Sequence, residues 1–284
     1  MAWKRILIKC EPAQPGHDIA TAWLADAGCS MFEENEHGLA AFAREEDLDA
    51  ETLGVTRQDL AALGLVDWVE AEVEEENWNA QWERDYEEVR VGQSIRVRAP
   101  FHPEKVDAAF GCTLTIQPRM AFGTGHHGTT RGLLAEMVGM EWSGQSVLDM
   151  GCGSGVLGIY AAIQGAGEVV AVDIDPWSVR NTEENLTLNS LESGPRFEVR
   201  EGGAAVLTEE DTDRFDVVIA NINRNILLAD MAAYALVLKP HGILMLSGFM
   251  EPDVPSLTAA AGGFGLEATV LRTEEEWRIL TLRR

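Results

Sequence analysis

A glycine-rich turn near the middle of the chain constrains the fold more than any other feature. The run VLDMGCGSGVLG at 147–158 indicates a buried strand ending near Asp149, a turn containing Gly151, Gly153 and Gly155, and the start of a helix. Glycine permits a tight turn and lets backbone N–H groups at a helix N-terminus approach a ligand. Strand, turn and helix in this order predict the ligand-binding edge of an open α/β sheet.

The chain from residue 93 onward alternates between predicted strands and predicted helices. Short apolar runs predict strands, and the stretches between them predict helices over 176–189 and 226–238. This alternation is typical of an α/β domain with a mostly parallel sheet, so we predict a Rossmann-like fold. The best strands are expected at 146–150, 168–175, 215–221 and 242–248, with residues 239–242 as the turn into the last of them.

The front of the chain is organised differently. Short β-like runs at 3–9, 39–43 and 68–73 are mixed with helical segments at 18–27 and 56–63, which predicts a small α+β unit. The run that follows, EEENWNAQWERDYEEV, repeats an aromatic residue every four positions, at Trp78, Trp82 and Tyr86, so these rings should share one helix face and pack between domains. We therefore predict a small α+β recognition domain at 1–75, a linker helix at 76–92 and the larger domain at 93–284.

Charge excludes one class of partner. The 284 residues carry 22 Lys and Arg against 47 Asp and Glu, a formal net charge of -25. Direct binding of nucleic acid draws most of its affinity from Lys and Arg at phosphates, so no direct nucleic-acid partner is expected. Residues 1–92 hold 22 acidic and 7 basic residues, the more acidic part of the chain. This acidity favours either a basic protein partner or a solubility or salt-adaptation role.

Composition also predicts where the protein works. No apolar stretch approaches the roughly 18 residues of a membrane helix, and no targeting signal is recognised, so we expect a soluble protein without a membrane partner. The four cysteines lie far apart without a C-x-x-C pair, which fits neither a zinc site nor a disulfide framework and favours the reducing cytoplasm. His126 and His127 are adjacent but lack a third ligand at a recognisable spacing, so no metal is expected.

Two ligands compete for the glycine turn. Gly153, Gly155 and Gly158 satisfy the G-x-G-x-x-G pattern of a nicotinamide site, and Asp173 lies twenty residues beyond the first of them. However, Asp149 at the mouth of the turn would repel a pyrophosphate and could accept a hydrogen bond from a ligand amine. S-adenosylmethionine carries an α-ammonium group and no phosphate, so it is the favoured ligand. Asp173 would hold the ribose hydroxyls in either case, and a nicotinamide-dependent oxidoreductase stays as an alternative.

Further segments resemble one family. The run MAFGTGHHGTTRG at 120–132 resembles the F-G-T-G-x-H-x-T-T signature of the PrmA family, the class I methyltransferases of ribosomal protein eleven of the large subunit. ANINRNIL at 220–227 resembles the A-N-I motif after that family's fourth strand. ENWNAQWERDY resembles its linker helix, and LKPHGILMLSGF its late strand. The resemblance covers most of residues 75–250, whereas the first 75 residues match only in size and α+β character.

The resemblance also implies site residues. Thr130, Gly151, Asp173 and Asn221 are expected to contact S-adenosylmethionine, and residues 122–125 to form a loop that closes over it. Together with the residues of the turn, the predicted cofactor-binding set is Phe122, Gly123, Thr130, Asp149, Gly151, Gly153, Asp173 and Asn221. Asn221 is also the predicted catalytic residue, because an amide oxygen at the end of a strand can aim an attacking amine.

The implied reaction is methyl transfer to lysine and N-terminal amines of ribosomal protein eleven, and the expected substrate is that protein free of the ribosome. The Asn-Ile-Asn run at 221–223 lacks the two prolines of the Asn-Pro-Pro-Tyr motif found in methyltransferases of planar amides or adenine amines, which favours an sp3 amine. The alternatives are a methyltransferase of another basic protein or small amine, the nicotinamide-dependent oxidoreductase, and a non-catalytic module that senses S-adenosylmethionine.

Overall fold

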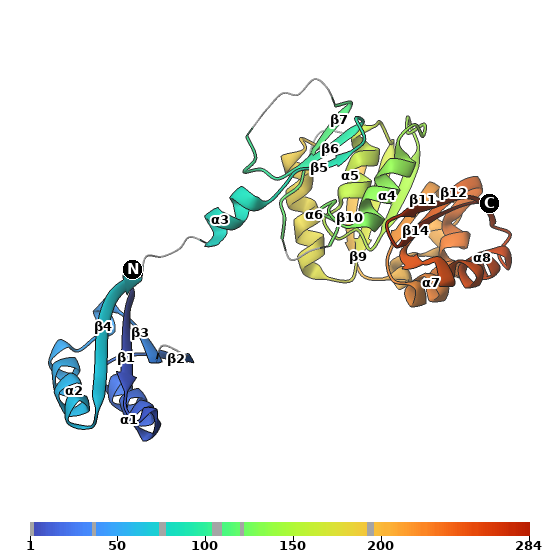
Figure 1. Cartoon of the computed structure of the whole chain (residues 1–284). Coiled ribbons are helices and arrows are strands. Elements are labelled where there is room, and N and C mark those ends of the chain that lie inside the picture. Colours follow the sequence, from blue (N-terminus) through green and yellow to red (C-terminus); the bar gives the residue numbers. More distant parts are fainter. Residues whose placement is uncertain (1–2, 36–37, 74–77, 104–109, 120–121, 192–195) are drawn as a thin grey trace. The chain divides into compact units, whose positions relative to one another are not determined.

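The computed structural model describes residues 3–35, 38–73, 78–103, 110–119, 122–191 and 196–284. The chain divides into two compact units, Met1–Asp85 and Tyr86–Arg284 (Figure 1). We call them the front unit and the core unit and describe each by itself. Within the described residues, no helix is both long enough and apolar enough to cross a bilayer.

The described residues of the front unit form an antiparallel sheet in the order β2-β3-β1-β4, with two helices packed on it. Ile6 and Ile8 of β1 are buried against the helices, whereas Leu7 between them is half-buried, which is the alternation of a sheet with one covered face. The elements are β1 Trp3–Cys10, α1 Ala13–Asp26, β2 Met31–Asn35, β3 Gly38–Arg44, α2 Ala50–Ala62, β4 Leu65–Val73 and α3 Trp78–Asp85.

The α+β character predicted for the front unit is confirmed, but several bounds differ: α2 begins six residues and β4 three residues before the predicted starts. Helix α1 begins at Ala13, five residues before the predicted start, and it contains a kink at Gln14, where the backbone is not helical (φ -111°, ψ 132°) just before Pro15 and Gly16. Strand β2 was not predicted, since its sequence MFEEN is too polar to stand out. The 3₁₀ turns of the chain are η1 Glu45–Asp47, η2 Ala204–Val206, η3 Glu209–Asp211 and η4 Glu251–Asp253.

The predicted linker helix at 76–92 is too long. Residues 74–77 lie outside the described residues, and α3 ends at Asp85. Tyr86 therefore follows the helix instead of continuing its aromatic face, and Val89–Val91 forms strand β5. The prediction failed because the i, i+4 spacing of aromatic residues continues across the helix end, where a strand of the core unit begins.

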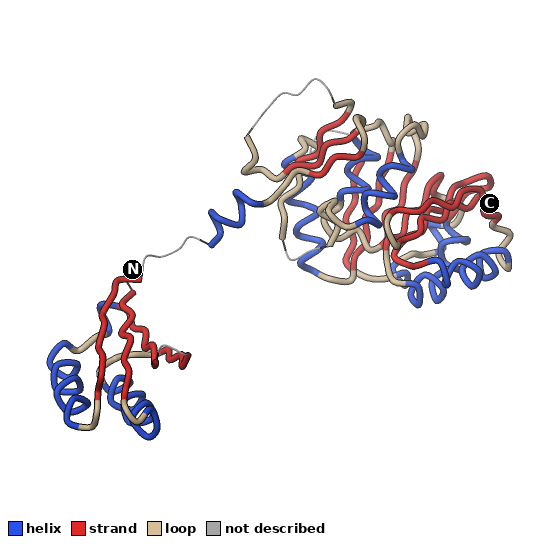
Figure 2. The backbone as a smooth tube through the Cα atoms, in the orientation of Figure 1, coloured by secondary structure: helices blue, strands red, loops and turns tan. Residues whose placement is uncertain are grey.

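In the described part of the core unit, one large sheet has the order β10-β9-β8-β11-β12-β14-β13. Figure 2 draws the strands of the core unit in red among the blue helices. The first five strands are parallel, and β14 and β13 add to them antiparallel. A smaller sheet has the order β5-β6-β7. The strands are β5 Val89–Val91, β6 Ile95–Arg98, β7 Cys112–Thr115, β8 Ser146–Met150, β9 Glu168–Asp173, β10 Arg196–Glu201, β11 Phe215–Asn221, β12 Leu238–Met250, β13 Glu267–Glu274 and β14 Trp277–Arg283.

Helices cover both faces of the large sheet. Along β8, Val147 packs in the cluster that contains α4 and α5, and Leu148 in the cluster that contains α7 and α8. A strand buried on both faces is continuously apolar, which is why this region was predicted correctly. The helices are α4 Gly128–Met137, α5 Val156–Ile163, α6 Pro176–Leu188, α7 Arg224–Val237 and α8 Val254–Gly262.

The four predicted core strands are all present, and one predicted turn is wrong. Residues 239–242 lie inside β12, where Leu238 pairs with Phe215 and Ile243 with Val217, so the extra residues form an irregularity within one strand. The strand order reverses direction at β8, whose neighbours are β9 and β11. In open α/β sheets, ligands bind beyond the carboxyl ends of the strands at such a reversal.

Candidate functional site

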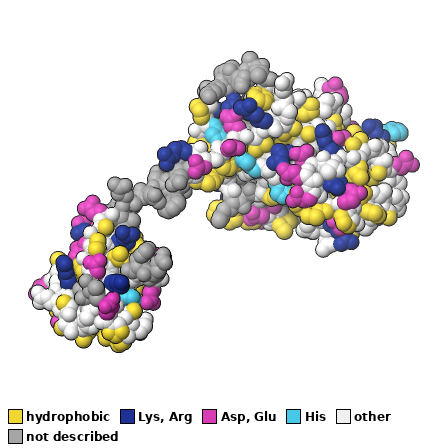
Figure 3. Space-filling view, in the orientation of Figure 1, with side chains coloured by type: hydrophobic (Ala, Val, Ile, Leu, Met, Phe, Trp, Pro, Cys, Tyr) yellow, Lys and Arg dark blue, Asp and Glu magenta, His cyan; other side chains and the backbone are white. Residues whose placement is uncertain are grey.

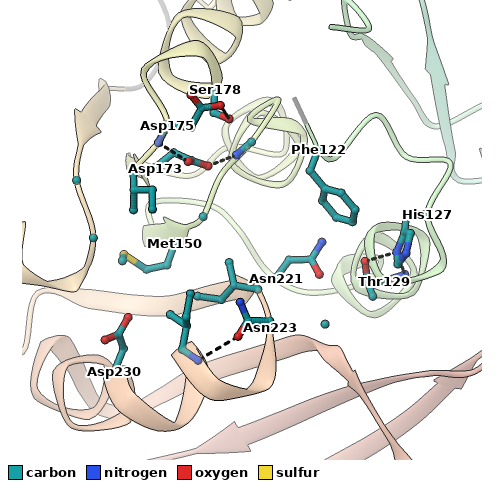
Figure 4. A pocket seen from close by; sticks show the side chains of 18 of the residues that line it. Phe122, His127, Thr129, Met150, Asp173, Asp175, Ser178, Asn221, Asn223 and Asp230 are labelled. Carbon is teal, nitrogen blue, oxygen red and sulfur yellow. Dashed lines mark hydrogen bonds between the residues drawn. The ribbon is translucent and has the colours of Figure 1, made fainter. Parts of the chain in front are cut away.

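A pocket of about 550 Å³ lies beyond the carboxyl ends of β8, β9 and β11. In Figure 4, Asp173 and Asp175 lie at one side of it, Phe122 and His127 at the other, and Asn221 between them. Its lining contains Gly151 and Gly153 of the predicted turn. Five of the predicted residues therefore line one cavity: Phe122, Gly151, Gly153, Asp173 and Asn221.

The glycine turn fastens the segment that we call the pocket loop, residues 122–127. The N–H of Ser154 donates to the carbonyl of Phe122 at 2.8 Å, and the Ser154 hydroxyl donates to the carbonyl of Gly123 at 2.7 Å. Gly153 has a φ of 56°, and a Cβ built on it would lie 2.3 Å from the Phe122 carbonyl oxygen. Glycine is therefore required there both for the left-handed backbone and for the close approach of the loop. Gly123 supports the loop without lining the pocket.

Asp173 is the last residue of β9 and organises the turn. Its Oδ2 accepts from the N–H of Gly153 at 2.8 Å, and its Oδ1 accepts from the N–H of Asp175 at 3.0 Å. Asp175 then caps α6 by accepting from the N–H of Trp177 at 3.1 Å. The carboxylate is thus held at the pocket wall, where its remaining lone pairs can accept from ligand hydroxyl groups.

Asn221 ends β11 and presents an unused acceptor. Its Nδ2 donates to the Thr130 hydroxyl at 3.3 Å, while its Oδ1 is buried and has no hydrogen-bond partner among the described residues. A buried polar atom without a partner costs free energy unless a ligand satisfies it. Thr130 is fully buried and does not line the pocket, so it orients the Asn221 amide, and the neighbouring Thr129 takes the lining position.

Asp149 lies beneath the turn and outside the pocket lining. Its Oδ2 accepts from the N–H of Gly158 at 2.9 Å, and its Oδ1 has no partner among the described residues. Complete burial, together with the charge of Asp173, raises the pKa of the Asp149 carboxyl to about 7. Asp149 thus contacts the start of α5 and is not among the residues that line the pocket.

Three aromatic side chains form the wall opposite the carboxylates. The ring of His127 lies 4.9 Å from that of Phe122 and 4.8 Å from that of Trp277, measured between centroids. His127 also caps α4, since its Nδ1 accepts from the N–H of Thr129 at 3.4 Å, and the same Nδ1 lies 2.8 Å from the Thr129 hydroxyl. Trp277, the first residue of β14, was missed because no local motif marks it. Among the described residues, no three His, Cys, Asp or Glu side chains gather as a metal site would require.

The chemistry of the lining separates the two candidate ligands. The described residues that line the pocket include Asp173, Asp175 and Asp230 but neither Lys nor Arg. Such a lining would repel a pyrophosphate, and it fits a cationic ligand that carries hydroxyl groups. The sequence analysis also missed Asp175 and Ser178, although D-x-x-S before a helix is a recognisable cap, and Gly202 and Gly203, because the strand before them was not predicted.

Comparisons place the chain among known proteins. The profile of the family described as ribosomal protein L11 methyltransferase (PrmA) matches residues 19–284. A Porphyromonas gingivalis protein named ribosomal protein L11 methyltransferase is 41% identical over 269 residues, which cover 94% of this chain and 90% of that protein. A Bacteroides fragilis protein of the same name is 37% identical over 266 residues, which cover 92% of this chain and 91% of that protein.

A solved structure agrees with the fold. The crystal structure of ribosomal protein L11 methylase from Lactobacillus delbrueckii subsp. bulgaricus superposes with a TM-score of 0.61 at 23% identity, covering 70% of this chain and 98% of that one. This likeness concerns the fold alone, and it confirms the predicted Rossmann-like class. The profile match and the identities with the relatives confirm the resemblance of the motifs: the chain belongs to the ribosomal protein L11 methyltransferase (PrmA) family.

Proposed function

We propose that this protein transfers methyl groups from S-adenosylmethionine to lysine and N-terminal amines of ribosomal protein L11. The observation that carries the proposal is the pocket rich in carboxylates at the reversal point of the sheet, whose lining includes Asn221 with its buried and unpaired Oδ1. The names of the relatives support the substrate, since they are called ribosomal protein L11 methyltransferases.

The cofactor would be held by residues at the ends of three strands. Asp173 would accept hydrogen bonds from the ribose hydroxyls, and Gly151 and Gly153 would let the backbone approach the ligand closely. Asp149, beneath the turn, would hold the start of α5 in place by accepting from the N–H of Gly158. When bound, S-adenosylmethionine supplies an electrophilic methyl group on a sulfonium.

The protein's own residues would prepare the amine. A lysine side chain has a reference pKa of about 10.4, so its ammonium group must lose a proton to water before it can attack. Asn221 Oδ1 would then accept from an N–H of the neutral amine and direct its lone pair, while Thr130 fixes the amide through Nδ2. Alignment of this kind and exclusion of water can supply much of the acceleration without a strong general base.

The aromatic wall would exclude that water. Phe122, His127 and Trp277 place apolar surface across the pocket from Asp173, so an entering lysine would leave its methylene groups against the rings. A desolvated ammonium group loses its proton more readily, which favours the reactive form of the amine. The wall would thus favour the neutral amine that the Asn221 amide then directs.

The test is the intact mass of purified ribosomal protein L11 before and after incubation with the enzyme and S-adenosylmethionine. Whole methyl increments are expected with the wild type and a strong reduction with Asp173→Ala. If the mass does not change while S-adenosylhomocysteine still binds, the protein substrate is wrong, and other basic proteins and small amines come next. A protein that binds the cofactor and methylates none of these would be a sensing module.

Cofactor identity needs its own measurement. S-adenosylhomocysteine should raise the melting temperature of the protein, because a ligand that binds only the folded state stabilises it. Nicotinamide dinucleotides should not, since their pyrophosphate would face the carboxylates of the pocket. Stabilisation by a dinucleotide alone would favour the oxidoreductase and contradict the proposal.

A further inference from the structure

The pocket loop is in contact with the segment through which the chain enters the core unit. That segment, residues 86–89, directly follows the end of the front unit at Asp85, and we call it the entry segment. It contacts the pocket loop through residues that are distinct from the pocket lining: Thr124, Gly125 and His126. Nothing in the function proposed above uses these contacts.

His126 makes two of the contacts that connect the pocket loop and the entry segment. Its Nε2 lies 2.9 Å from the carbonyl oxygen of Glu87, and its Nδ1 lies 3.2 Å from the Thr124 hydroxyl. A carbonyl can only accept, so Nε2 carries the proton and donates to Glu87. In the corresponding tautomer Nδ1 accepts, and the hydroxyl of Thr124 donates to it.

Tyr86 completes the connection. Its side chain forms a hydrogen bond with that of Thr124, and its ring packs edge-on against His126, with centroids 4.6 Å apart. The chain of hydrogen bonds thus starts at Tyr86, passes through two loop side chains and returns to Glu87, so it is closed on the entry segment.

Packing adds a third attachment. Val89 is buried, and a Cβ placed on Gly125 would lie 3.5 Å from the Val89 side chain, so the loop backbone rests directly on it. The two ends of the loop, Phe122 and His127, line the pocket. Gly123 and Gly125 have φ angles of 97° and 94°, so the backbone on both sides of Thr124 has the freedom of glycine. One short loop therefore touches the ligand cavity with its ends and the entry segment with its middle.

We infer that Tyr86 and His126 are positioning residues that couple the cofactor pocket to the segment through which the front unit joins the core unit. Binding of the cofactor would order the pocket loop and, through these contacts, the entry segment. By reciprocity, a protein substrate held by the front unit would favour the same loop state and strengthen cofactor binding. The inference rests on the proposed function, because it takes the pocket to be the cofactor site.

The test is amide hydrogen exchange of the full chain with and without S-adenosylhomocysteine, read by mass spectrometry in three regions. Exchange at residues 150–158 reports cofactor binding, and exchange at residues 122–127 reports ordering of the pocket loop. Exchange at residues 86–91 reports whether that ordering reaches the entry segment. In the wild type all three should exchange more slowly with the ligand. We expect the slowing at 86–91 to be about fivefold, the lower end of common coupling factors.

Variants separate coupling from general loosening. His126→Ala and Tyr86→Phe should keep the ligand-dependent protection at 150–158 and lose most of it at 86–91. His126→Gln should restore part of it, because its amide can donate to Glu87. The control is His102→Ala: His102 Nε2 contacts the Tyr86 carbonyl at 2.6 Å and its ring stacks on that of Tyr86, so it contacts the entry segment without contacting the pocket loop through these interactions. This variant should behave like the wild type.

Each outcome has a definite meaning. Protection at 150–158 and 122–127 without protection at 86–91 in the wild type would overturn the coupling. So would His126→Ala retaining full protection at 86–91, or His102→Ala losing as much as His126→Ala. Absence of protection at 150–158 would instead contradict the cofactor site itself, and with it the proposed function.

Discussion

Asp173 is the residue whose loss should affect the cofactor most directly. Its carboxylate holds two backbone N–H groups and faces the pocket, so Asp173→Ala removes both the acceptor and the order of the turn. We expect S-adenosylhomocysteine binding to weaken by about 1.5 to 3 kcal/mol, the range for hydrogen bonds to a charged group. Isothermal titration calorimetry would measure it, with Asp173→Asn as an intermediate case. Unchanged affinity would remove Asp173 from the site.

Asp149 should make stability depend on pH. Burial raises the pKa of its carboxyl from 3.8 to about 7, so the folded state binds a proton that the unfolded state releases between these values. The stabilisation is complete below pH 3.8 and is lost as the pH rises towards 7, by up to about 1.4 kcal/mol per pH unit. Urea unfolding at several pH values between 5 and 7.5 would show this decline in the wild type.

The matched variant for that experiment is Asp149→Asn, which keeps the acceptor for Gly158 and cannot ionise. Its absolute stability will differ, so the quantity to compare is the slope of unfolding free energy against pH. The slope should be flatter than in the wild type. Equal slopes would mean that Asp149 ionises normally in the folded protein.

The site residues that belong to local motifs could be predicted from the sequence. Gly151, Gly153 and Asp173 follow from a strand, a turn and the next strand, and Asn221 from a strand end together with the family resemblance. Trp277 could not be foreseen, because it reaches the pocket only when β14 pairs with β12 and places it opposite Met250. The burial of Asp149 was missed for a related reason: a carboxylate at a strand end faces solvent or core depending on the helix packed beside it.

At the scale of elements, the turn between β8 and α5 should tolerate no side chain at Gly153. Gly153→Ala brings a Cβ to within 2.3 Å of a backbone oxygen of Phe122, so the pocket loop must move. Gly139→Ala is the matched control, since Gly139 has a φ of 85° but open space around it. The control should lose about 1 to 2 kcal/mol from backbone conformation alone.

The difference between these two variants isolates the clash. We expect Gly153→Ala to unfold at lower urea concentration than Gly139→Ala and also to lose affinity for S-adenosylhomocysteine, whereas Gly139→Ala should bind normally. Equal stability and equal affinity of the two variants would show that the turn and the loop adjust independently of each other.

Elements were predictable where burial imposes a pattern. The central residues of β8, β9, β11 and β12 are covered on both faces, so each of these strands contains a run of mostly apolar residues. Strand β13 was missed because it is an edge strand with most of its residues exposed. The end of α3 was missed because the aromatic spacing continues into the entry segment. Tyr86 there lies outside the helix and packs against His126 of the core unit.

At the scale of the whole molecule, charge is the property that bears on substrate choice. Residues 1–92 hold 22 acidic and 7 basic residues, and Asp and Glu side chains are visible on the front unit as well as on the core unit in Figure 3. A net charge of -25 attracts a basic protein and repels ribosomal RNA. We therefore propose that the front unit recognises ribosomal protein L11 before it is assembled into the ribosome.

This proposal predicts the salt dependence and the state of the substrate together. Raising the salt concentration screens charges beyond a Debye length of about 10 Å at 0.1 M, so kcat/KM for free ribosomal protein L11 should fall by about tenfold between low and high salt. The affinity for S-adenosylhomocysteine, measured at each salt concentration, is the control and should change little. At low salt the free protein should be methylated faster than the same protein in intact ribosomes, because phosphate groups surround it there. Equal rates on both substrates, or a rate that ignores salt, would mean that the acidity serves solubility and that recognition rests on shape alone.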